Sequence, residues 1–249
     1  MNKQQQHYNS INDIYRNHYY DSTAMRYRKK FLFDFLFKDI NFNDLKIADI
    51  ASGAGHNSLS IIKKFPNAKT VGFDISDKAC AEYRENTGNE SIKVDLTEQQ
   101  DFKQEFDIVI VIGGLHHCVS NLKQTMNNIN NMLKPGGYLL MMEPNKQYVL
   151  ESVRKFWYKK DKYFESSTEE ALNHDEILSL AGPNIKLDKV NYLGGPAYFL
   201  IFNSMIFRIP IGIKKFIAPP LFFLERVYNY IPIKLFHPIF ISRLIKETD

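Results

Sequence analysis

The sequence predicts an α/β fold in which a doubly wound, mostly parallel seven-stranded sheet carries helices on both faces. Short β-branched apolar runs alternate with amphipathic segments, a pattern typical of βαβ units. The run Lys134-Pro-Gly-Gly137 separates a helical segment from an apolar one, because proline and glycine end a helix and reverse the chain. The 249 residues are enough for one such domain with an appendage.

Strands and helices are expected to alternate from residue 45 onward. Right-handed crossovers between parallel strands then give a doubly wound sheet. We expect strands at 45–51, 70–75, 91–96, 107–112, 138–143, 185–192 and 239–245. We expect helices at 57–65, 77–86, 121–133 and 168–180, the last capped by Ser167 or Thr168.

The chain divides into four segments by composition. Residues 1–40 are predicted to form an N-terminal helical cap, or lid, with two helices over 11–37. Residues 41–195 form the α/β core, and residues 237–249 add its final strand. Between them, residues 196–236 form an apolar helical insertion near the C-terminus, with helices expected at 197–213 and 216–233.

The overall composition is that of a globular protein, with 44% hydrophobic and 24% charged residues. Two cysteines do not make a disulfide framework, and residues 1–10 lack an apolar secretory region. We therefore expect a cytoplasmic protein. No basic stripe interleaved with aromatic residues is present, so a nucleic-acid partner is not expected.

The net charge of +4 lies in the most apolar part of the chain. Residues 196–249 hold seven Lys or Arg against three acids, while the remaining residues balance. An uncharged run over 190–207 barely reaches the length of a membrane span and contains Gly194-Gly195-Pro196. We interpret the insertion as a substrate lid or an interfacial, peripheral membrane element. A dimer interface or additional core is the alternative.

A strand that runs into small residues and then into a helix marks a candidate cofactor site. The segment Asp49-Ile-Ala51-Ser-Gly53-Ala-Gly55 lets the backbone approach a ligand at a helix N-terminus. Asp74 ends the next strand 19 positions after Gly55, where an exposed carboxylate can accept hydrogen bonds from both ribose hydroxyls. A nicotinamide dinucleotide site uses similar parts, but it favours Gly or Ala where Ser58 stands.

Five segments in order and at the right spacing resemble the class I S-adenosylmethionine (SAM)-dependent methyltransferases. The first is Asp49–Gly55, and the second is Asp74, which matches the family's ribose-binding acid. The others are Val94-Asp-Leu96, the run Phe106–His117, and Met132-Leu-Lys-Pro-Gly-Gly-Tyr-Leu-Leu140. Agreement across several levels is specific where one motif is not. The sequence departs from the family at Ala51, where Gly is frequent, and at Ile112-Gly113, where polar side chains are common.

The resemblance implies SAM as cofactor and a set of residues that hold it. Asp49 and the loop through Gly55 would hold the methionyl part, and Asp95-Leu96 the adenine. Tyr20 and Arg26, with Tyr19, lie in an aromatic segment that would cover SAM, unless it is a packed surface helix. The implied cofactor-binding residues are Tyr20, Arg26, Asp49, Ala51, Gly53, Gly55, Asp74, Ile75, Asp95, Leu96, Ile112 and Gly113.

Three side chains are candidates for chemistry at the acceptor. His116 and His117 follow the fourth strand, and Glu143 ends the fifth, on the side of the sheet where ligands bind. A general base is needed only if the acceptor loses a proton, as a hydroxyl does. The alternatives are histidines that pack or cap and an ordinary strand-end carboxylate. No metal site is expected, because the consecutive residues His116-His117-Cys118 rarely converge on one ion.

The sequence therefore predicts a SAM-dependent methyltransferase that acts on a hydrophobic or lipid-linked small-molecule acceptor, with oxygen as the methylated atom. One alternative is a methyltransferase for a soluble metabolite, with the apolar tail as a homodimer interface. The other is a non-catalytic binding protein of the same fold, against which the ribose acid Asp74 argues.

Overall fold

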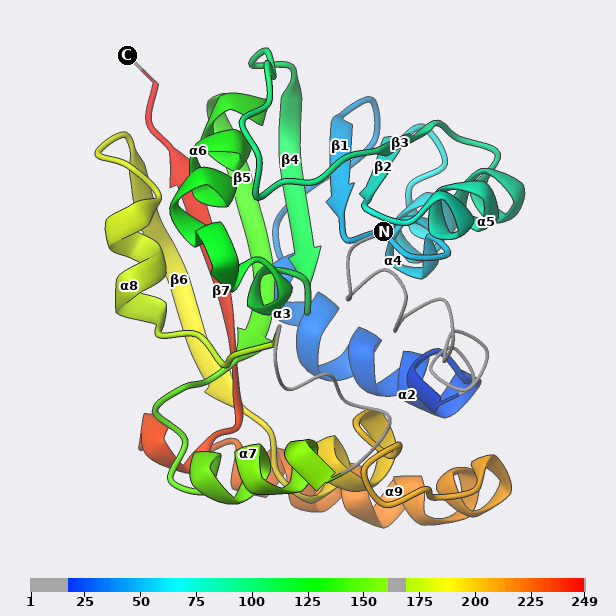
Figure 1. Cartoon of the computed structure of the whole chain (residues 1–249). Helices are drawn as coiled ribbons and strands as arrows, with labels where there is room; N and C mark the ends of the chain where they lie inside the picture. Colours follow the sequence, from blue (N-terminus) through cyan, green and yellow to red (C-terminus); the bar gives the residue numbers. More distant parts are fainter. Residues whose placement is uncertain (1–17, 161–168, 249) are drawn as a thin grey trace. The chain divides into compact units, whose positions relative to one another are not determined.

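The computed structural model describes residues 18–160 and 169–248 (Figure 1). A seven-stranded sheet in the order β3-β2-β1-β4-β5-β7-β6 confirms the predicted fold class. The strands β1 to β5 pair in parallel, and β7 is antiparallel. The strand bounds are β1 Lys46–Ile50, β2 Lys69–Asp74, β3 Ser91–Lys93, β4 Phe106–Ile112, β5 Leu133–Pro144, β6 Ile185–Leu193 and β7 Ile239–Lys246.

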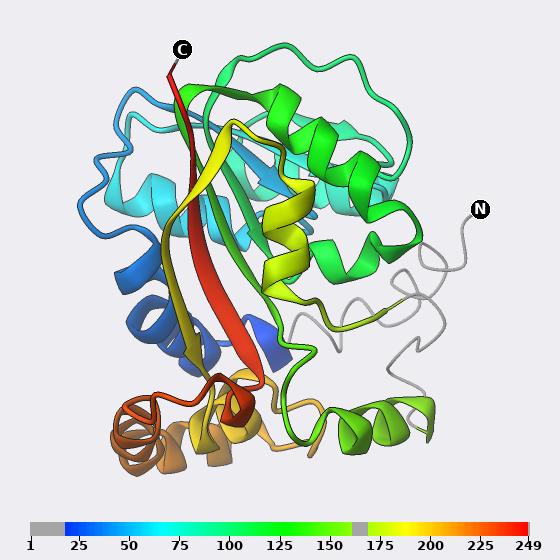
Figure 2. The same cartoon turned by 90° about the vertical axis from the view of Figure 1, so that its left-hand side faces the viewer.

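Helices cover both faces of this sheet. Helix α4 (His56–Lys64) lies on one face, and α6 (Leu122–Met132) with α8 (His174–Leu180) lies on the other (Figure 2). Helix α5 (Asp77–Thr87) follows β2, and short 3₁₀ turns at Leu115–His117 and Val119–Asn121 follow β4. The central strands are buried on both sides, as a parallel sheet between two helical layers requires.

The chain divides into two compact units. An α/β unit comprises residues 39–144, 166–190 and 242–249, and a helical unit comprises residues 1–38, 145–165 and 191–241. The division passes through β6 and β7. The segments expected as an N-terminal cap and as an apolar insertion therefore belong to the same unit, together with α7 (Glu151–Lys160).

Several expected boundaries in the α/β unit differ from the structure. The 134–137 turn lies within β5 as a bulge, where Gly136 has a φ of 77° and the pairing with β4 shifts register. Strand β3 stops at Lys93, since the Asp95 carboxylate accepts hydrogen bonds from the backbone and hydroxyl of Thr97 and turns the chain. Helix α8 begins at His174 with Asn173 as its cap. The expected caps Ser167 and Thr168 lie outside the described residues.

In the helical unit, the pair of helices expected at 197–213 and 216–233 differs from the structure, while the pair expected over 11–37 lies partly outside the described residues, which begin at residue 18. Residues 22–36 form one helical run, made of α2 (Ser22–Tyr27), a π-helical stretch η1 (Arg28–Phe33) and α3 (Asp34–Leu36). The expected helices 197–213 and 216–233 are instead a π-helical turn η4 (Tyr198–Phe202) and the single helix α9 (Ile211–Tyr228). Arg208 has a φ of 51°, and this left-handed residue separates the two.

No described helix is long and apolar enough to cross a membrane. Helix α9 contains Pro219 and Pro220 within its 18 residues, and a short 3₁₀ turn at Lys234–Phe236 follows it.

A buried carboxylate organises the helical unit. Glu225, on α9, accepts hydrogen bonds from the backbone N–H groups of Gly195, Ala197 and Tyr198 at 2.9–3.2 Å. It also accepts one from the hydroxyl of Tyr27 on α2 at 2.6 Å. Burial raises the pKa of Glu225, and these four donors oppose that shift. The carboxylate thus joins α9, the start of η4 and α2.

Replacing Tyr27 with Phe is expected to lower the free energy of unfolding by about 1–3 kcal/mol, since a buried carboxylate loses a donor. Urea denaturation followed by circular dichroism measures the change. Tyr230→Phe is the matched control, because Tyr230 is 86% exposed. Equal stability of both variants would contradict a structural role for the Tyr27 hydroxyl.

Candidate functional site

The loop after β1 is built from three residues in the left-handed region. Ala51, Gly53 and Gly55 have φ values of 50°, 51° and 81°. Gly55 cannot be replaced without movement, because a Cβ there would lie 2.7 Å from Thr87 Cγ2. At Gly53 no atom lies within 4 Å of an added Cβ, so the backbone there borders open space. The loop is therefore packed at Gly55 and open to a ligand at Gly53.

Asp49 is buried at the end of β1 and ties the strand to α4. Its carboxylate accepts hydrogen bonds from the Ser58 hydroxyl at 2.7 Å and the Ser58 backbone N–H at 3.3 Å. Tyr83, on α5, donates its hydroxyl to Ser58 at 2.8 Å. Ser58, which weakened the dinucleotide interpretation of the sequence, is thus the residue that holds Asp49. No sequence pattern identified Tyr83, because it reaches the site only through the packing of α5.

Asp74 connects the loops that follow β1 and β2. Its two carboxylate oxygens accept hydrogen bonds from the backbone N–H groups of Gly53 and Ser76, both at 2.9 Å. Burial raises the pKa of Asp74, while backbone N–H groups of Ser76, Gly53 and Ile75 oppose the shift. The sequence suggested an exposed acid, whereas the structure places it half-buried between two loops. Each oxygen keeps a further lone pair that can accept a ribose hydroxyl.

The loop after β3 is fixed from two sides. The Asp95 side chain caps its own turn through Thr97, and the backbone carbonyl of Asp95 accepts a hydrogen bond from Gln100. The carbonyl of Leu96 accepts hydrogen bonds from Thr125 and Asn128 of α6. The segment implied to hold adenine therefore has a defined backbone path.

The loop after β4 approaches the loop after β1 closely. Ile112 ends the strand, and Gly113 follows with a φ of 71° and donates its N–H to Met142 on β5. A Cβ on Gly114 would lie 2.8 Å from the Cβ of Ala51, so a side chain there would push the two loops apart. Gly114 is a site residue beyond those expected from the sequence, where its only signal is the Gly113-Gly114 pair before the histidines.

Glu143 lies beneath this loop and is fully buried. It accepts hydrogen bonds from the backbone N–H groups of Gly114, Leu115 and His116 at 2.8–3.3 Å. Its second oxygen lies 2.8 Å from Nδ1 of the His116 ring. Burial raises the pKa of Glu143 to about 8, and the three backbone donors oppose the shift. The carboxyl and the imidazole form a hydrogen-bonded pair.

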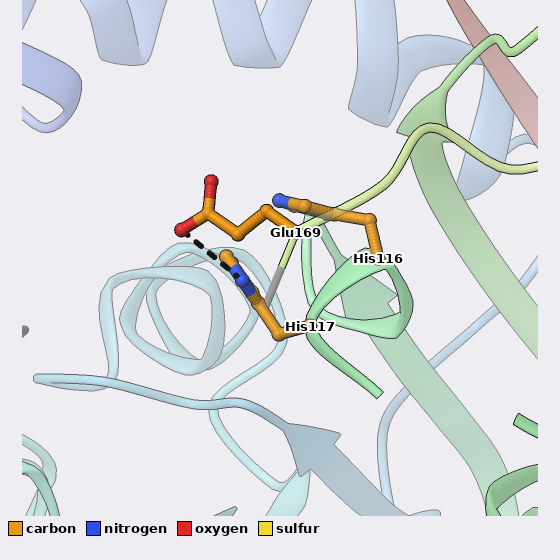
Figure 3. A group of neighbouring side chains, drawn as sticks. All are labelled: His116, His117 and Glu169. Carbon is orange, nitrogen blue, oxygen red and sulfur yellow. Dashed lines mark ion pairs between the residues drawn. The ribbon is translucent and has the colours of Figure 1, made fainter. Parts of the chain in front are cut away.

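A second acid–histidine pair adjoins the first (Figure 3). His117 Nδ1 lies 3.5 Å from a carboxylate oxygen of Glu169, and the centres of the His116 and His117 rings are 3.8 Å apart. The backbone N–H of Glu170 donates to the carbonyl of His116, which fastens this segment to the histidine loop. Glu169 is far from both histidines in the sequence, so only the fold could bring it here.

His116, His117 and Glu169 could together hold a metal ion. Their ligand atoms lie within 4.8 Å of one another. In a tetrahedral zinc site, with bonds near 2.0–2.1 Å, neighbouring ligand atoms are about 3.4 Å apart. The 3.5 Å distance from His117 Nδ1 to the Glu169 carboxylate oxygen already matches that spacing. If the nearest ring nitrogen of His116 lies farther away, the His116 side chain would have to move to bind the same ion. The same side chains also suit proton transfer.

Tyr20 and Arg26 lie in the helical unit with different partners. The Arg28 guanidinium lies over the Tyr20 ring at 4.4 Å, and the Arg26 guanidinium lies 5.6 Å from the Phe222 ring. Tyr19 donates its hydroxyl to Asn203. A role for this segment in covering SAM stays a prediction.

The residues of the α/β unit fit SAM as a bound group. Parallel pairing aligns β1 with β2 and β4, so the loops containing Gly53, Asp74 and Gly113 emerge at the same edge of the sheet. Asp74 would supply acceptors for the ribose, and the open space at the Gly53 backbone would allow close approach of the rest of the molecule. Asp95 and Leu96 follow the neighbouring strand β3 at that edge.

Comparison with known proteins agrees with this geometry. Residues 41–192 match a protein family described as a methyltransferase domain. Release factor glutamine methyltransferase of Flavobacterium psychrophilum is 35% identical over 75 residues, which are 28% of this chain and 26% of that protein. Demethylmenaquinone methyltransferase of Chlorobaculum parvum is 33% identical over 100 residues, 40% of this chain and 41% of that protein. The chain thus spans less than half the length of these curated relatives.

Solved structures share the fold across nearly the whole chain. N-methyltransferase NodS of Bradyrhizobium japonicum, in complex with S-adenosyl-L-homocysteine, matches with a TM-score of 0.58 at 10% sequence identity. The match covers 97% of this chain and 99% of the NodS chain. A protein of Pyrococcus horikoshii matches with a TM-score of 0.58 at 17% sequence identity, and the match covers 95% of this chain and 99% of that protein. At such identities the likeness concerns the fold alone.

Asp74→Ala is expected to weaken SAM binding strongly, because two charge-assisted hydrogen bonds of about 1.5–3 kcal/mol each are lost. Stability should also fall, since the Gly53 and Ser76 N–H groups lose their acceptor. Isothermal titration calorimetry at a temperature where the variant is folded measures the affinity. Asp77→Ala, an exposed acid on α5, serves as the control. Unchanged SAM affinity in Asp74→Ala would exclude the ribose assignment.

Removal of metal ions is expected to leave methyl transfer unchanged, because the methyl group of SAM is already activated and a histidine can accept the proton of the acceptor without an ion. Turnover before and after dialysis against EDTA is the measurement, with mass spectrometry of bound metals on both samples. Loss of turnover that Zn²⁺ restores would assign His116, His117 and Glu169 to an ion.

Proposed function

Because the chain belongs to the class I SAM-dependent methyltransferases, we propose that it transfers a methyl group from SAM to an oxygen of a hydrophobic or lipid-linked small-molecule acceptor. SAM is the methyl donor of this family. The names of the relatives specify different acceptors, a release factor glutamine in one and demethylmenaquinone in another. Family membership therefore does not fix the acceptor, and the choice rests on the side chains of this chain.

The observation that carries methylation at oxygen is the Glu143–His116 pair. Methyl transfer breaks the bond from the sulfonium sulfur to the methyl carbon and forms a bond from that carbon to the acceptor oxygen. A hydroxyl acceptor must lose its proton as this happens, whereas many amine acceptors are already nucleophilic. A histidine held by a buried carboxylate is the usual arrangement for accepting such a proton.

Glu143 fixes the orientation of the base in this proposal. With Nδ1 turned toward the carboxylate, Nε2 at the opposite edge of the ring can accept the hydroxyl proton. The pKa of Glu143, raised to about 8, gives the pair a proton affinity near neutral pH, where a general base is most effective. Glu143 contacts the base and is therefore a positioning residue, while His116 is proposed as the catalytic one. His117, paired with Glu169, is the second candidate.

The hydrophobic part of the proposal rests on the distribution of apolar surface. Of the 18 large apolar side chains that are exposed in the described part of the chain, 16 belong to the helical unit. Such concentration is typical of a surface that meets apolar ligands, lipid or protein. The cysteines Cys80 and Cys118 are both free thiols, which is compatible with a cytoplasmic protein.

Two other functions make different predictions. A methyltransferase for a soluble metabolite, with the apolar surface as a homodimer interface, should form a stable dimer and methylate polar acceptors. A non-catalytic binding protein should bind SAM without releasing S-adenosylhomocysteine. Calorimetry with SAM, followed by product analysis with a mixture of apolar phenols, polyprenyl alcohols and polar metabolites, separates the three.

His116→Gln is expected to lower the turnover number by roughly 10²–10⁴ with SAM affinity nearly unchanged, because the proton acceptor is lost while the cofactor loops remain. Turnover of the wild-type protein should rise with pH as the Glu143–His116 pair loses its proton, and His116→Gln should flatten that dependence.

His117→Gln is the matched control, since it replaces the neighbouring ring at the same loop. Loss of turnover in His116→Gln alone would assign the base to His116, and loss in His117→Gln alone would assign it to His117. Full turnover in both variants would contradict a histidine base and favour a mechanism without one.

A further inference from the structure

We propose that the helical unit binds the surface of an anionic lipid bilayer through the exposed side chains of α7 and α9. This goes beyond methyl transfer and concerns where the protein meets a lipid-linked acceptor. Lipid binding can be measured without turnover, so it can fail independently of the proposed reaction.

Helix α9 is apolar on the side that it exposes. Ile213, Phe216, Phe223 and Val227 recur at helical spacing and are all exposed, with Phe216 at 86% and Phe223 at 64%. The opposite side, which includes Ala218 and Phe222, is buried within the unit. A surface helix of a globular protein normally turns its polar side outward. Here the outward side carries two phenylalanines, Phe216 and Phe223.

Helix α7 repeats this pattern. Val153, Phe156 and Trp157 are exposed at the spacing of one helical face. Trp157 also contacts Phe207, with ring centres 6.3 Å apart, which links α7 to the segment before α9. Both views show α7 and α9 along one edge of the helical unit (Figures 1 and 2).

The exposed charges of α7, α9 and the segments that flank them have one sign. In residues 145–160 and 191–241 the only acids are Glu151 and Glu225, and both are buried. Glu225 is held by four hydrogen bonds, and Glu151 pairs with Arg154. The same segments expose seven cationic side chains, namely Lys146, Lys155, Lys159, Arg208, Lys215, Arg226 and Lys234. We refer to the exposed apolar and cationic side chains of 145–160 and 207–236 as the apolar–cationic surface.

An anionic bilayer suits the apolar–cationic surface better than a second copy of the chain. A symmetric dimer places the same patch of each copy together. The exposed cations of the two copies would then face one another, and like charges oppose such an interface. A bilayer surface offers negative headgroups to the cations and an apolar interior to the phenylalanines. Because no described helix can span a membrane, the expected contact is peripheral.

The protein contains one tryptophan, and its place in α7 gives a direct measurement. Trp157 is 45% exposed, so its fluorescence should shift to shorter wavelength when α7 enters the lipid interface. Two kinds of vesicle are compared. One contains phosphatidylcholine with about 30 mol% phosphatidylglycerol, which gives an anionic surface, and the other contains phosphatidylcholine alone. Co-sedimentation gives the bound fraction. Raised salt should weaken binding to the anionic vesicles without abolishing it.

The full chain with Phe216→Ser and Phe223→Ser is expected to bind anionic vesicles at least about 10-fold more weakly, because the two largest apolar contacts are lost. Removing the charges of Lys215 and Arg226 by Gln substitution should weaken binding about fivefold each, as for about 1 kcal/mol per residue near anionic lipid. Leu187→Ser, an exposed apolar side chain of the α/β unit, is the matched control and should bind like the wild-type protein. SAM affinity, measured on the same samples, confirms that each variant is folded.

Two results would overturn the proposal. One is wild-type protein that stays in the supernatant with anionic vesicles at low salt, with no shift of Trp157 fluorescence. The other is a stable dimer by light scattering that dissociates in the Phe216→Ser, Phe223→Ser variant, which would assign the apolar–cationic surface to self-association. Failure of His116→Gln to change turnover would contradict the proposed chemistry and leave the lipid result unaffected.

Discussion

Both units of this protein depend on hydrogen-bond acceptors for backbone N–H groups in loops that are buried away from water. Backbone donors outside helices and strands need acceptors when they are buried. Here carboxylates provide them: Asp74 serves Gly53 and Ser76, and Glu143 serves Gly114, Leu115 and His116. Glu225 serves three consecutive loop donors in the helical unit. Burying these acids raises the pKa of each, so the loops are held at some electrostatic cost.

The same carboxylates that order the loops lie where chemistry is expected. Asp74 fixes the turn at Gly53 and still has lone pairs for a ribose. Glu143 fixes the loop after β4 and also contacts the His116 ring. In the proposed function, the atoms that order the loops at this edge of the sheet also hold the cofactor and position the base. A substitution at either acid removes a loop acceptor as well as a functional group, so variants of His116 and His117 separate the two effects better.

The helical unit uses its acids differently. Asp21 caps α2 and pairs with the buried Lys214, while Glu225 joins α9 to Tyr27 and to η4. Glu151 and Glu225 are buried, whereas seven cationic side chains of residues 145–160 and 191–241 are exposed. Folding thus increases the net positive charge of the exposed surface of these segments, because Glu151 and Glu225, which partly offset that charge in the sequence, are buried. A segment that is only moderately basic in sequence becomes uniformly cationic where it is exposed.

The sequence by itself determined the sheet and the family, and it predicted which loops would hold SAM. The strand periodicity and the order Asp49, Gly53, Gly55 and Asp74 are local patterns, and parallel strands bring their ends to one edge whatever the packing details. The tertiary structure decided which side chains meet across long stretches of chain. Glu169 reaches His117, Tyr83 reaches Ser58, and Tyr27 reaches Glu225 through contacts that no spacing rule encodes. It also decided that 211–228 forms one helix, because the backbone turns left-handed at Arg208 and Pro210 then begins a new helix. Local sequence specifies backbone preference, but the burial of Glu151 and Glu225 and the exposure of Phe216 depend on what the rest of the chain packs against.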